Sequence, residues 1–438
     1  MNSVVPFPLS AAGRAMLIKL FAAGLLIVLL TLAADAALIT HGGLDSPVNG
    51  DGPYFIGLAR SLASGHGYRL KRSFWPDQPD ISRSPLWPVI LSIPASLFPN
   101  ANDNAILRFT GAALHAVSAA LMLLLTFQLT GSFVGGVLAG VFLGMYPPAS
   151  ALAVTGYSEI AFLVVVLAGL VLAFEGGKLA YCGVLLAGAG VLARPNFVLL
   201  PAVLLAWNAV FRPTRLAQWR NLRLWVIGGA LFTLPAALWV ARNYAVTGHF
   251  PILSGMEGET LYGGNNERVA TDLSVWGYWI MPNEIPGEKT KRDLAQTRTE
   301  WELNTYYHDR AMQFIRANWY ALPRLMVGKL VRGFVPVPWV PLPASYIAFF
   351  FRGCVYAAFI ALGFSWRERN EAYTLVAGAM FLVTLATTLI YYGTYRFTFC
   401  IEPFLFPFIV AGAANAWRTA RGLRAAFHRR SGAGPRIC

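Results

Sequence analysis

The feature that most constrains this chain is a series of apolar runs, each about 20 residues long, that recur along most of its length. A helix of about 20 residues crosses the roughly 30 Å hydrocarbon core of a bilayer. Only 13% of the residues are charged and 56% are hydrophobic. A water-soluble domain carries about 25% charged residues. The chain is therefore predicted to be an all-α polytopic membrane protein.

The apolar runs predict ten membrane crossings. In chain order they are residues 16–39, 105–129, 133–149, 151–174, 179–193, 195–211, 222–241, 345–364, 371–392 and 396–417. The fifth and sixth crossings are short and meet at Arg194 and Pro195. One kinked or re-entrant element is therefore an alternative for that pair.

Lys and Arg residues predict the orientation of these crossings. An even number of crossings places both termini and several basic loops on one side, and basic loops favour the cytoplasm. These loops and the tail hold Arg212, Arg215, Arg220, Arg223, Arg367, Arg369, Arg418, Arg421, Arg424, Arg429, Arg430 and Arg436. The net charge of +14 is thus explained by topology and by attraction to anionic lipid, not by nucleic acid. Both termini are therefore predicted to lie in the cytoplasm.

Five parts follow from this topology. They are the first helix and first external loop (1–104), a transmembrane bundle (105–241), a second external loop (242–344), the C-terminal helices (345–417) and a basic cytoplasmic tail (418–438). Both external loops lie on the periplasmic side. Amphipathic or short apolar segments at 54–63, 86–98 and 305–335 predict external juxtamembrane helices at the membrane interface.

The first external loop gathers acids ahead of a basic cluster. Asp45 and Asp51 precede Arg60, His66, Arg69, Lys71, Arg72 and Arg83. An ionisable group at membrane depth is a functional candidate, and Asp51 is the better candidate for a base because Asp45 lies farther from the helix. Its alternative role is to cap the helix that follows. The cations suit a phosphate, since Arg offers a planar fork, but contact with lipid headgroups is their alternative.

Three further charged residues lie at predicted outer helix ends. Glu159 near the start of the fourth crossing is either an inter-helix partner or an acid facing the substrate. Arg194 and Arg396 lie where positive-inside statistics do not favour cations. We expect each of these arginines to bind a phosphate or a carboxylate, with Glu159 or Glu402 as the candidate carboxylate.

The second external loop carries a weaker signal. Its segment 242–266 is rich in Gly and Asn, and such loops serve as linkers or as ligand-binding walls. Tyr262 and Asn265 are candidates for contact with sugar hydroxyls, and Tyr54 and His66 of the first loop are candidate substrate contacts as well. No metal or nucleotide motif occurs. We therefore expect no required cofactor and assign no metal ligand, although carboxylates can bind a divalent cation without a fixed spacing.

Read in order, these motifs resemble the bacterial GT-C glycosyltransferases of the protein-mannosyltransferase and lipid A aminoarabinose-transferase type. The matching segments are DGPYFIGLARSLASGHGY at 51–68, PLWP at 85–88, Tyr-Ser-Glu at 157–159, Ala-Arg-Pro at 193–195, Arg-Asn with a later Gly at 242–248, and Tyr-Arg-Phe at 395–397. The resemblance spans nearly the whole chain. It departs from a common family pattern in having Asp-Gly rather than paired acids at 51–52.

The resemblance implies a GT-C-like helical bundle and an inverting membrane enzyme. Such an enzyme takes a sugar from a polyprenyl-phosphate donor at the outer face and passes it to an envelope acceptor: lipid A, a polysaccharide, a lipid or a protein. Asp51 would be the catalytic base. Arg60, Arg69, Arg83, Arg194 and Arg396 are the candidate phosphate ligands. A transporter or flippase of lipid-linked sugars is the main alternative, although no internal repeat of the kind transporters show is present.

Overall fold

The computed structural model describes residues 11–43, 48, 50–70, 74–75, 78–211, 219–250, 254–296, 298–338, 343–365 and 370–431. Within these ranges every regular element is an α-helix or a short 3₁₀-helix, and no strand occurs. The all-α prediction is confirmed. Asp45, Lys71, Arg72, Arg212, Arg215, Arg367, Arg369 and Arg436 lie outside the described residues.

Five of the described helices are long and apolar enough to cross a membrane. They are α1 (Ala11–Gly42), α4 (Asp103–Thr130), α11 (Trp219–Thr247), α17 (Pro343–Ala361) and α18 (Glu371–Ile390). A sixth candidate is the pair α5 (Phe133–Gly144) and α6 (Pro147–Val154), which is bent by 49°. Shorter helices occupy the other predicted crossings: α7 (Glu159–Glu175), α8 (Gly177–Ala189), η1 (Gly190–Leu192), η2 (Pro195–Leu199) and α9 (Leu200–Phe211).

Three predicted crossings have different boundaries in the structure. The crossing predicted at 133–149 ends at Gly144, and a bend follows because Pro147 and Pro148 begin α6. The crossing predicted at 151–174 starts only at Glu159, after a turn in which Gly156 has a φ of 74°. The last crossing, predicted at 396–417, is α19 (Tyr395–Phe399), η6 (Glu402–Leu405) and then α20 (Phe406–Ser431). Much of the basic tail therefore belongs to α20.

Glycines bring the first helices of the bundle into close contact. Gly136, Gly140 and Gly144 follow one another at intervals of four residues on α5. A Cβ at Gly140 would lie 2.9 Å from the Ala119 carbonyl oxygen of α4, and one at Gly144 would lie 2.1 Å from Thr31 of α1. Small residues at this spacing let helix backbones approach in a membrane. The N-terminal half of the bundle is thus packed backbone against backbone.

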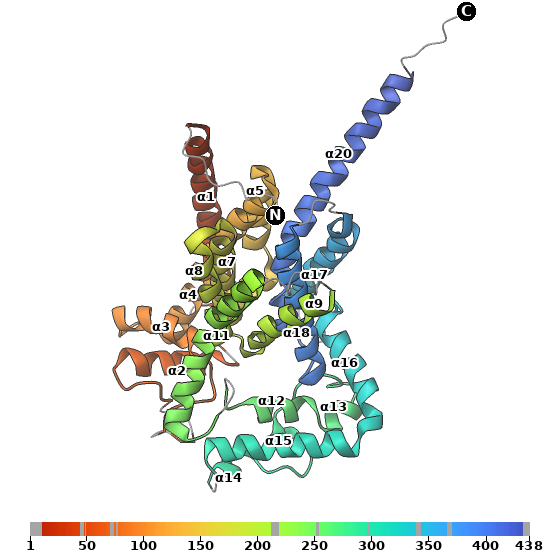
Figure 1. The fold of residues 1–438 in the computed structure, drawn as a ribbon. Helices are drawn as coiled ribbons and strands as arrows, with labels where there is room; N and C mark the ends of the chain where they lie inside the picture. The colour runs from red at the N-terminus through yellow and green to blue at the C-terminus, as the bar shows by residue number, and fades with distance from the viewer. Residues whose placement is uncertain are drawn as a thin grey trace, which may run out of the picture.

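The two segments predicted to be external lie at one end of the bundle. The first carries α2 (Gly52–Ala63) and α3 (Leu86–Leu97), and the second carries α12 (Glu257–Gly264), α13 (Glu267–Thr271), η3 (Pro282–Glu284), α14 (Lys291–Ala295), α15 (Glu300–Ala317), η4 (Trp319–Ala321) and α16 (Leu322–Phe334). Figure 1 shows both segments at the end opposite the one from which α20 extends. Helices are present at all three predicted juxtamembrane positions. The segment 305–335 is two helices, separated at Asn318, because Pro323 starts the second.

Candidate active site

Asp51 lies at the N-terminus of α2 and uses its side chain for ion pairs. Its Oδ1 accepts a hydrogen bond from Nη2 of Arg83 at 3.1 Å, and its Oδ2 accepts from Nη1 and Nη2 of Arg396, both at 3.2 Å. Within the described part of α2, the Asp51 side chain makes no capping hydrogen bond to the helix backbone. The capping alternative is therefore wrong. The sequence places this carboxylate at a helix start, and the fold directs it toward arginines from distant parts of the chain.

Glu159 is the second carboxylate of the site and is fully buried at the first turn of α7. Its Oε1 accepts from Nε of Arg396 at 2.6 Å and from Nη1 of Arg194 at 3.1 Å. We expected a phosphate or a carboxylate partner for each of these arginines, and the structure shows a carboxylate, Glu159, for both. Their binding of a phosphate stays a prediction. Glu402 instead pairs with Arg352 at 2.7 Å. A carboxylate at the first turn of a helix is also favoured by the helix dipole.

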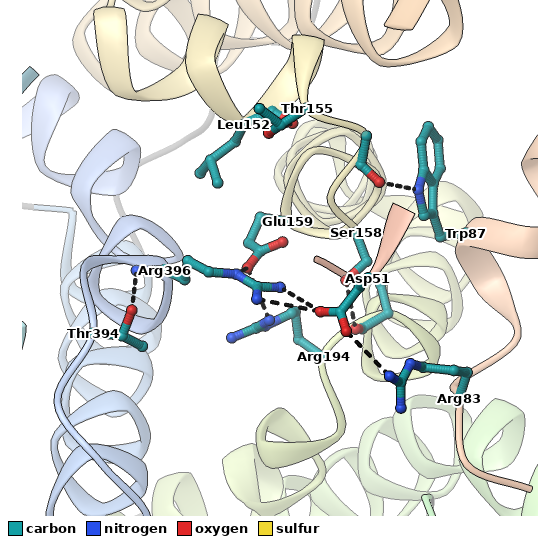
Figure 2. Close-up of polar contacts among 12 residues, drawn as sticks. Asp51, Arg83, Trp87, Leu152, Thr155, Ser158, Glu159, Arg194, Thr394 and Arg396 are labelled. Atoms are coloured by element: carbon teal, nitrogen blue, oxygen red, sulfur yellow. Dashed lines mark hydrogen bonds and ion pairs between the residues drawn. The ribbon is translucent and has the colours of Figure 1, made fainter. Parts of the chain in front are cut away.

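Arg396 joins the two halves of the site. Figure 2 shows its guanidinium between Glu159 and Asp51, with Arg83 on the far side of Asp51. We call the set of Asp51, Arg83, Glu159, Arg194 and Arg396 the arginine–carboxylate cluster. Its three arginines and two carboxylates carry a net charge of +1 when all are ionised. The cluster thus has one positive charge more than its own acids neutralise.

Several buried polar atoms of the cluster have no hydrogen-bond partner among the described residues. They are Nε of Arg83, Nε of Arg194 and Oε2 of Glu159. An unsatisfied buried donor costs about 1–3 kcal/mol. These atoms lie beside a positive charge that the cluster's own acids do not neutralise, and this excess charge favours the binding of an anion here.

A turn that begins at Asp80 positions Arg83. Oδ1 of Asp80 accepts from the backbone amide of Ser82 at 3.0 Å and from that of Arg83 at 3.2 Å. Arg242 of α11 donates to the Asp80 carbonyl oxygen at 2.8 Å and so fastens the turn to the bundle. The Arg83 guanidinium lies over the ring of Tyr54 at 4.9 Å. Tyr54 is therefore adjacent to the cluster, while its contact with a substrate stays a prediction.

A ring face and a short helix position Arg396. Its guanidinium carbon lies 3.9 Å from the centre of the Tyr157 ring, close enough for a cation–π contact. Thr394 caps α19 by accepting from the Arg396 amide, a contact drawn in Figure 2. Arg194 lies over the ring of Phe397 at 5.3 Å. Aromatic faces thus support all three arginines of the cluster.

The arginines hold Asp51 in its ionised form. Burial tends to raise the pKa of this carboxyl, but Arg83, Arg396 and Arg194 lower it by more, so the pKa of Asp51 lies below its ordinary value. The carboxylate is therefore charged at neutral pH. While it stays paired it is also a weak proton acceptor, because a base of low pKa accepts protons poorly.

Other predicted site residues lie elsewhere. Arg60 donates to the carbonyl oxygens of Ala95, Phe98, Pro99 and Ala101 and pairs with Asp103 at 2.8 Å, so it joins the end of α3 to the start of α4. His66 is exposed and contacts Ser64, and Arg69 is exposed as well. Tyr262 donates to Glu288, while Asn265 bonds to Leu261, Ile390 and Lys329. The fold does not bring these residues into the cluster.

Two residues of the site were not singled out from the sequence. Asp80 is buried and orders the loop that carries Arg83. An Asp followed two residues later by Ser, just ahead of a helix, is a recognisable Asx-turn signal. Tyr157 belongs to the Tyr-Ser-Glu motif, but its contact with Arg396 joins positions 239 residues apart and has no local signature.

The geometry defines a class of site: a positively charged cluster around two carboxylates at one end of a helical bundle. Comparisons with known proteins add little to it. No family model matches the chain, and no curated protein matches it. Among solved structures it is similar to ArnT from Cupriavidus metallidurans bound to undecaprenyl phosphate, with 13% identity and a TM-score of 0.41 over 92% of this chain and 79% of that one. A similarity of that size carries no argument on function.

Metal ligation has no clear place in this site. Among the described residues, no group of three or more His, Cys, Asp or Glu side chains is arranged to hold a metal ion. Asp51 and Glu159 both face arginines instead. The cluster therefore consists of guanidinium groups paired with carboxylates.

Proposed function

We propose that this protein is an inverting glycosyltransferase that moves a sugar from a polyprenyl-phosphate donor to a hydroxyl of an envelope acceptor. The reaction takes place at the outer face of the bacterial inner membrane, and the acceptor is lipid A, a polysaccharide, a lipid or a protein. One observation carries the proposal: Asp51 lies between Arg83 and Arg396 in a cluster with net positive charge. A base and a phosphate site are thus adjacent.

The arginines would bind the phosphate of the donor. Guanidinium groups suit phosphate because their paired N–H donors match its oxygens. As the bond between sugar and phosphate breaks, negative charge grows on the phosphate oxygens. Preorganised cations stabilise that charge, and the loss of one such donor costs about 10²–10³-fold in rate in a well-studied enzyme.

Asp51 would act as the base. It takes the proton of the acceptor hydroxyl while the oxygen attacks the anomeric carbon. A new glycosidic bond forms, the bond to the phosphate oxygen breaks, and its electron pair leaves with the polyprenyl phosphate. Attack opposite the leaving group inverts the configuration. Glu159 is buried and bonded to two arginines, so a second carboxylate is not free to form a covalent intermediate. No cofactor takes part in this scheme.

The position of the cluster favours this reaction over transport of a lipid-linked sugar. Asp51 and Glu159 are at helix starts, Arg194 is between two 3₁₀-helices, and Arg396 is on the short helix after α18. Transporters typically hold substrate near the bilayer midplane, between broken helices. Asp51 and Arg83 belong to the segment that carries α2 and α3 at one end of the bundle, and this position suits chemistry at one face.

A deletion strain complemented with variants tests the function. We expect the strain to lose one glycan from its envelope and to accumulate a polyprenyl-phosphate sugar, both seen by mass spectrometry. The wild-type gene should restore the product, whereas Asp51→Asn should transfer about 10²–10⁴-fold more slowly. Asp103→Asn is the matched control, since Asp103 pairs with Arg60 outside the cluster. Full transfer by Asp51→Asn would show that Asp51 is not the base.

A further inference from the structure

Asp51 occupies Nη2 of Arg83 and both terminal nitrogens of Arg396, which are groups that a phosphate would use. Both of its oxygens are engaged, one by Arg83 and one by Arg396. The same guanidinium groups are the nearest cations to the base, and they are the groups assigned to the donor under the proposed function. A phosphate that binds both arginines through these terminal nitrogens must displace Asp51 from at least part of its contacts.

We infer that the donor phosphate and Asp51 compete for Arg83 and Arg396, so that Asp51 becomes free to act as a base only after the donor has bound. This inference rests on the proposed function and adds an order of events to it. The donor binds first and releases the carboxylate. The acceptor hydroxyl is then deprotonated.

The burial of the cluster shows which contacts can exchange. The side chain of Asp51 is 31% exposed, that of Arg396 is 22% exposed and that of Arg83 is 13% exposed. Glu159 is completely buried. Arg396 holds Glu159 through Nε and Asp51 through its two terminal nitrogens. Its terminal nitrogens can therefore change partner while Nε keeps the guanidinium in place.

The exchange would also reset the base after each transfer. Paired to arginines, Asp51 has a pKa below its ordinary value. Once a phosphate takes those arginines, the carboxylate loses its stabilising partners and accepts a proton more readily. When the polyprenyl phosphate leaves, the arginines return to Asp51 and the proton moves to water. One proton enters Asp51 and one leaves it in every cycle.

Binding of a prenyl phosphate to the full-length protein tests the competition without any transfer. The probes are farnesyl phosphate and, as an uncharged control, farnesol. If Asp51 holds the arginines about 90% of the time, its removal should tighten binding about tenfold. We therefore expect Asp51→Asn to lower the Kd for farnesyl phosphate about tenfold and to leave that for farnesol unchanged. Asp103→Asn, which alters an acid outside the cluster, should change neither Kd.

Each outcome decides the inference. Equal or weaker binding of farnesyl phosphate by Asp51→Asn would overturn it, since a competitor cannot be removed without strengthening its rival. An equal gain in affinity for farnesol would also overturn it. Farnesol has no phosphate, so the gain would then come from contacts with the prenyl chain. The proposed function can fail separately. If no sugar is transferred but Asp51→Asn binds the phosphate more tightly, the competition stands and the activity does not.

Discussion

Two arginine–carboxylate networks share one short segment of this protein, and they differ in kind. Residues 394–405 contribute Arg396 to the cluster described above and Glu402 to a second network deeper in the bundle. In the second network, Nε of Arg352 donates to Glu402 at 2.7 Å. Both side chains are almost completely inaccessible to solvent, at 1% and 0%. One network reaches solvent and the other does not.

The Arg352–Glu402 network is balanced in charge. It contains one cation and one anion, and tyrosines complete the shell of Glu402. Tyr146 donates to one carboxylate oxygen at 2.9 Å and Tyr356 to the other at 2.7 Å, while Thr398 accepts from Arg352 at 2.7 Å. Removal of one partner of a buried ion pair leaves an uncompensated buried charge, which is strongly destabilising. This network ties α17 to the segment that carries Arg396.

The comparison shows what distinguishes a candidate binding site from a structural ion-pair network. Unpartnered atoms do not distinguish the two networks, because Nη1 of Arg352 has no partner among the described residues, just as Nε of Arg83 has none. Burial of a charged residue does not distinguish them either, because both networks contain one. The difference is an excess positive charge together with partial exposure, which only the cluster around Asp51 combines. The excess positive charge attracts an anion to the first network, whereas burial leaves the second network inaccessible from solvent.

The largest expected effect is on stability, and it falls on the balanced network. Arg352→Met leaves Glu402 buried without its cation, and breaking a buried pair costs about 3–5 kcal/mol. We expect this variant to be poorly folded in detergent, with a much lower Tm by tryptophan fluorescence. Arg83→Met is the matched control. Its ion pair with Asp51 is partly exposed, so it should lose no more than about 1 kcal/mol.

The double variant Arg352→Met with Glu402→Gln checks the cause of that loss. Removing both charges takes away the uncompensated carboxylate, so part of the lost stability should return. An Arg352→Met protein that unfolds at the wild-type temperature would contradict the structural role. Equal losses for Arg352→Met and Arg83→Met would remove the distinction between the two networks.

The second-largest expected effect is on the rate of sugar transfer, and it comes from substitutions within the cluster. Arg396 uses three nitrogens to bridge two acids, whereas Arg83 reaches Asp51 through one. A lysine ammonium can replace a single hydrogen bond of an arginine, but it cannot reproduce the several N–H donors of a guanidinium group that bridges two acids. We expect Arg396→Lys to slow transfer about 10–100-fold, a loss of about 1.4–2.7 kcal/mol, with little change in Tm. Arg83→Lys should lose less than about tenfold. The reverse order, measured as kcat/KM in membranes, would contradict this assignment.

The sequence predicted much of this arrangement because its strongest signals are local. Apolar runs predicted the long helices, and the unusual position of Arg194 and Arg396 at outer helix ends predicted a phosphate or a carboxylate partner. The structure supplies that partner as Glu159. The bent and broken crossings were harder, since a proline pair and a glycine turn divide runs that are apolar throughout.

The choice among the basic residues of the first loop depended on geometry. Arg60 follows Asp51 by nine residues on one helix, which places it about 13 Å along the axis and on the opposite face. That reasoning excludes Arg60 from contact with Asp51 and was available from the sequence. The contact between Arg83 and Asp51 could not be predicted from the sequence. It depends on the turn at Asp80 and on the hydrogen bond from Arg242 of α11 to that turn.

The smallest expected effect concerns the ring beneath Arg396. A cation–π contact contributes about 0.5–2 kcal/mol, depending on burial. Tyr157→Leu should therefore slow transfer by a few-fold to about 30-fold, whereas Tyr157→Phe keeps the ring face and should stay near the wild-type rate. Arg352 also lies near rings, at 5.0 Å from Phe349, but hydrogen bonds already fix it. Phe349→Leu should thus leave transfer unchanged. If Tyr157→Phe lost as much activity as Tyr157→Leu, the hydroxyl rather than the ring face would hold Arg396 in place.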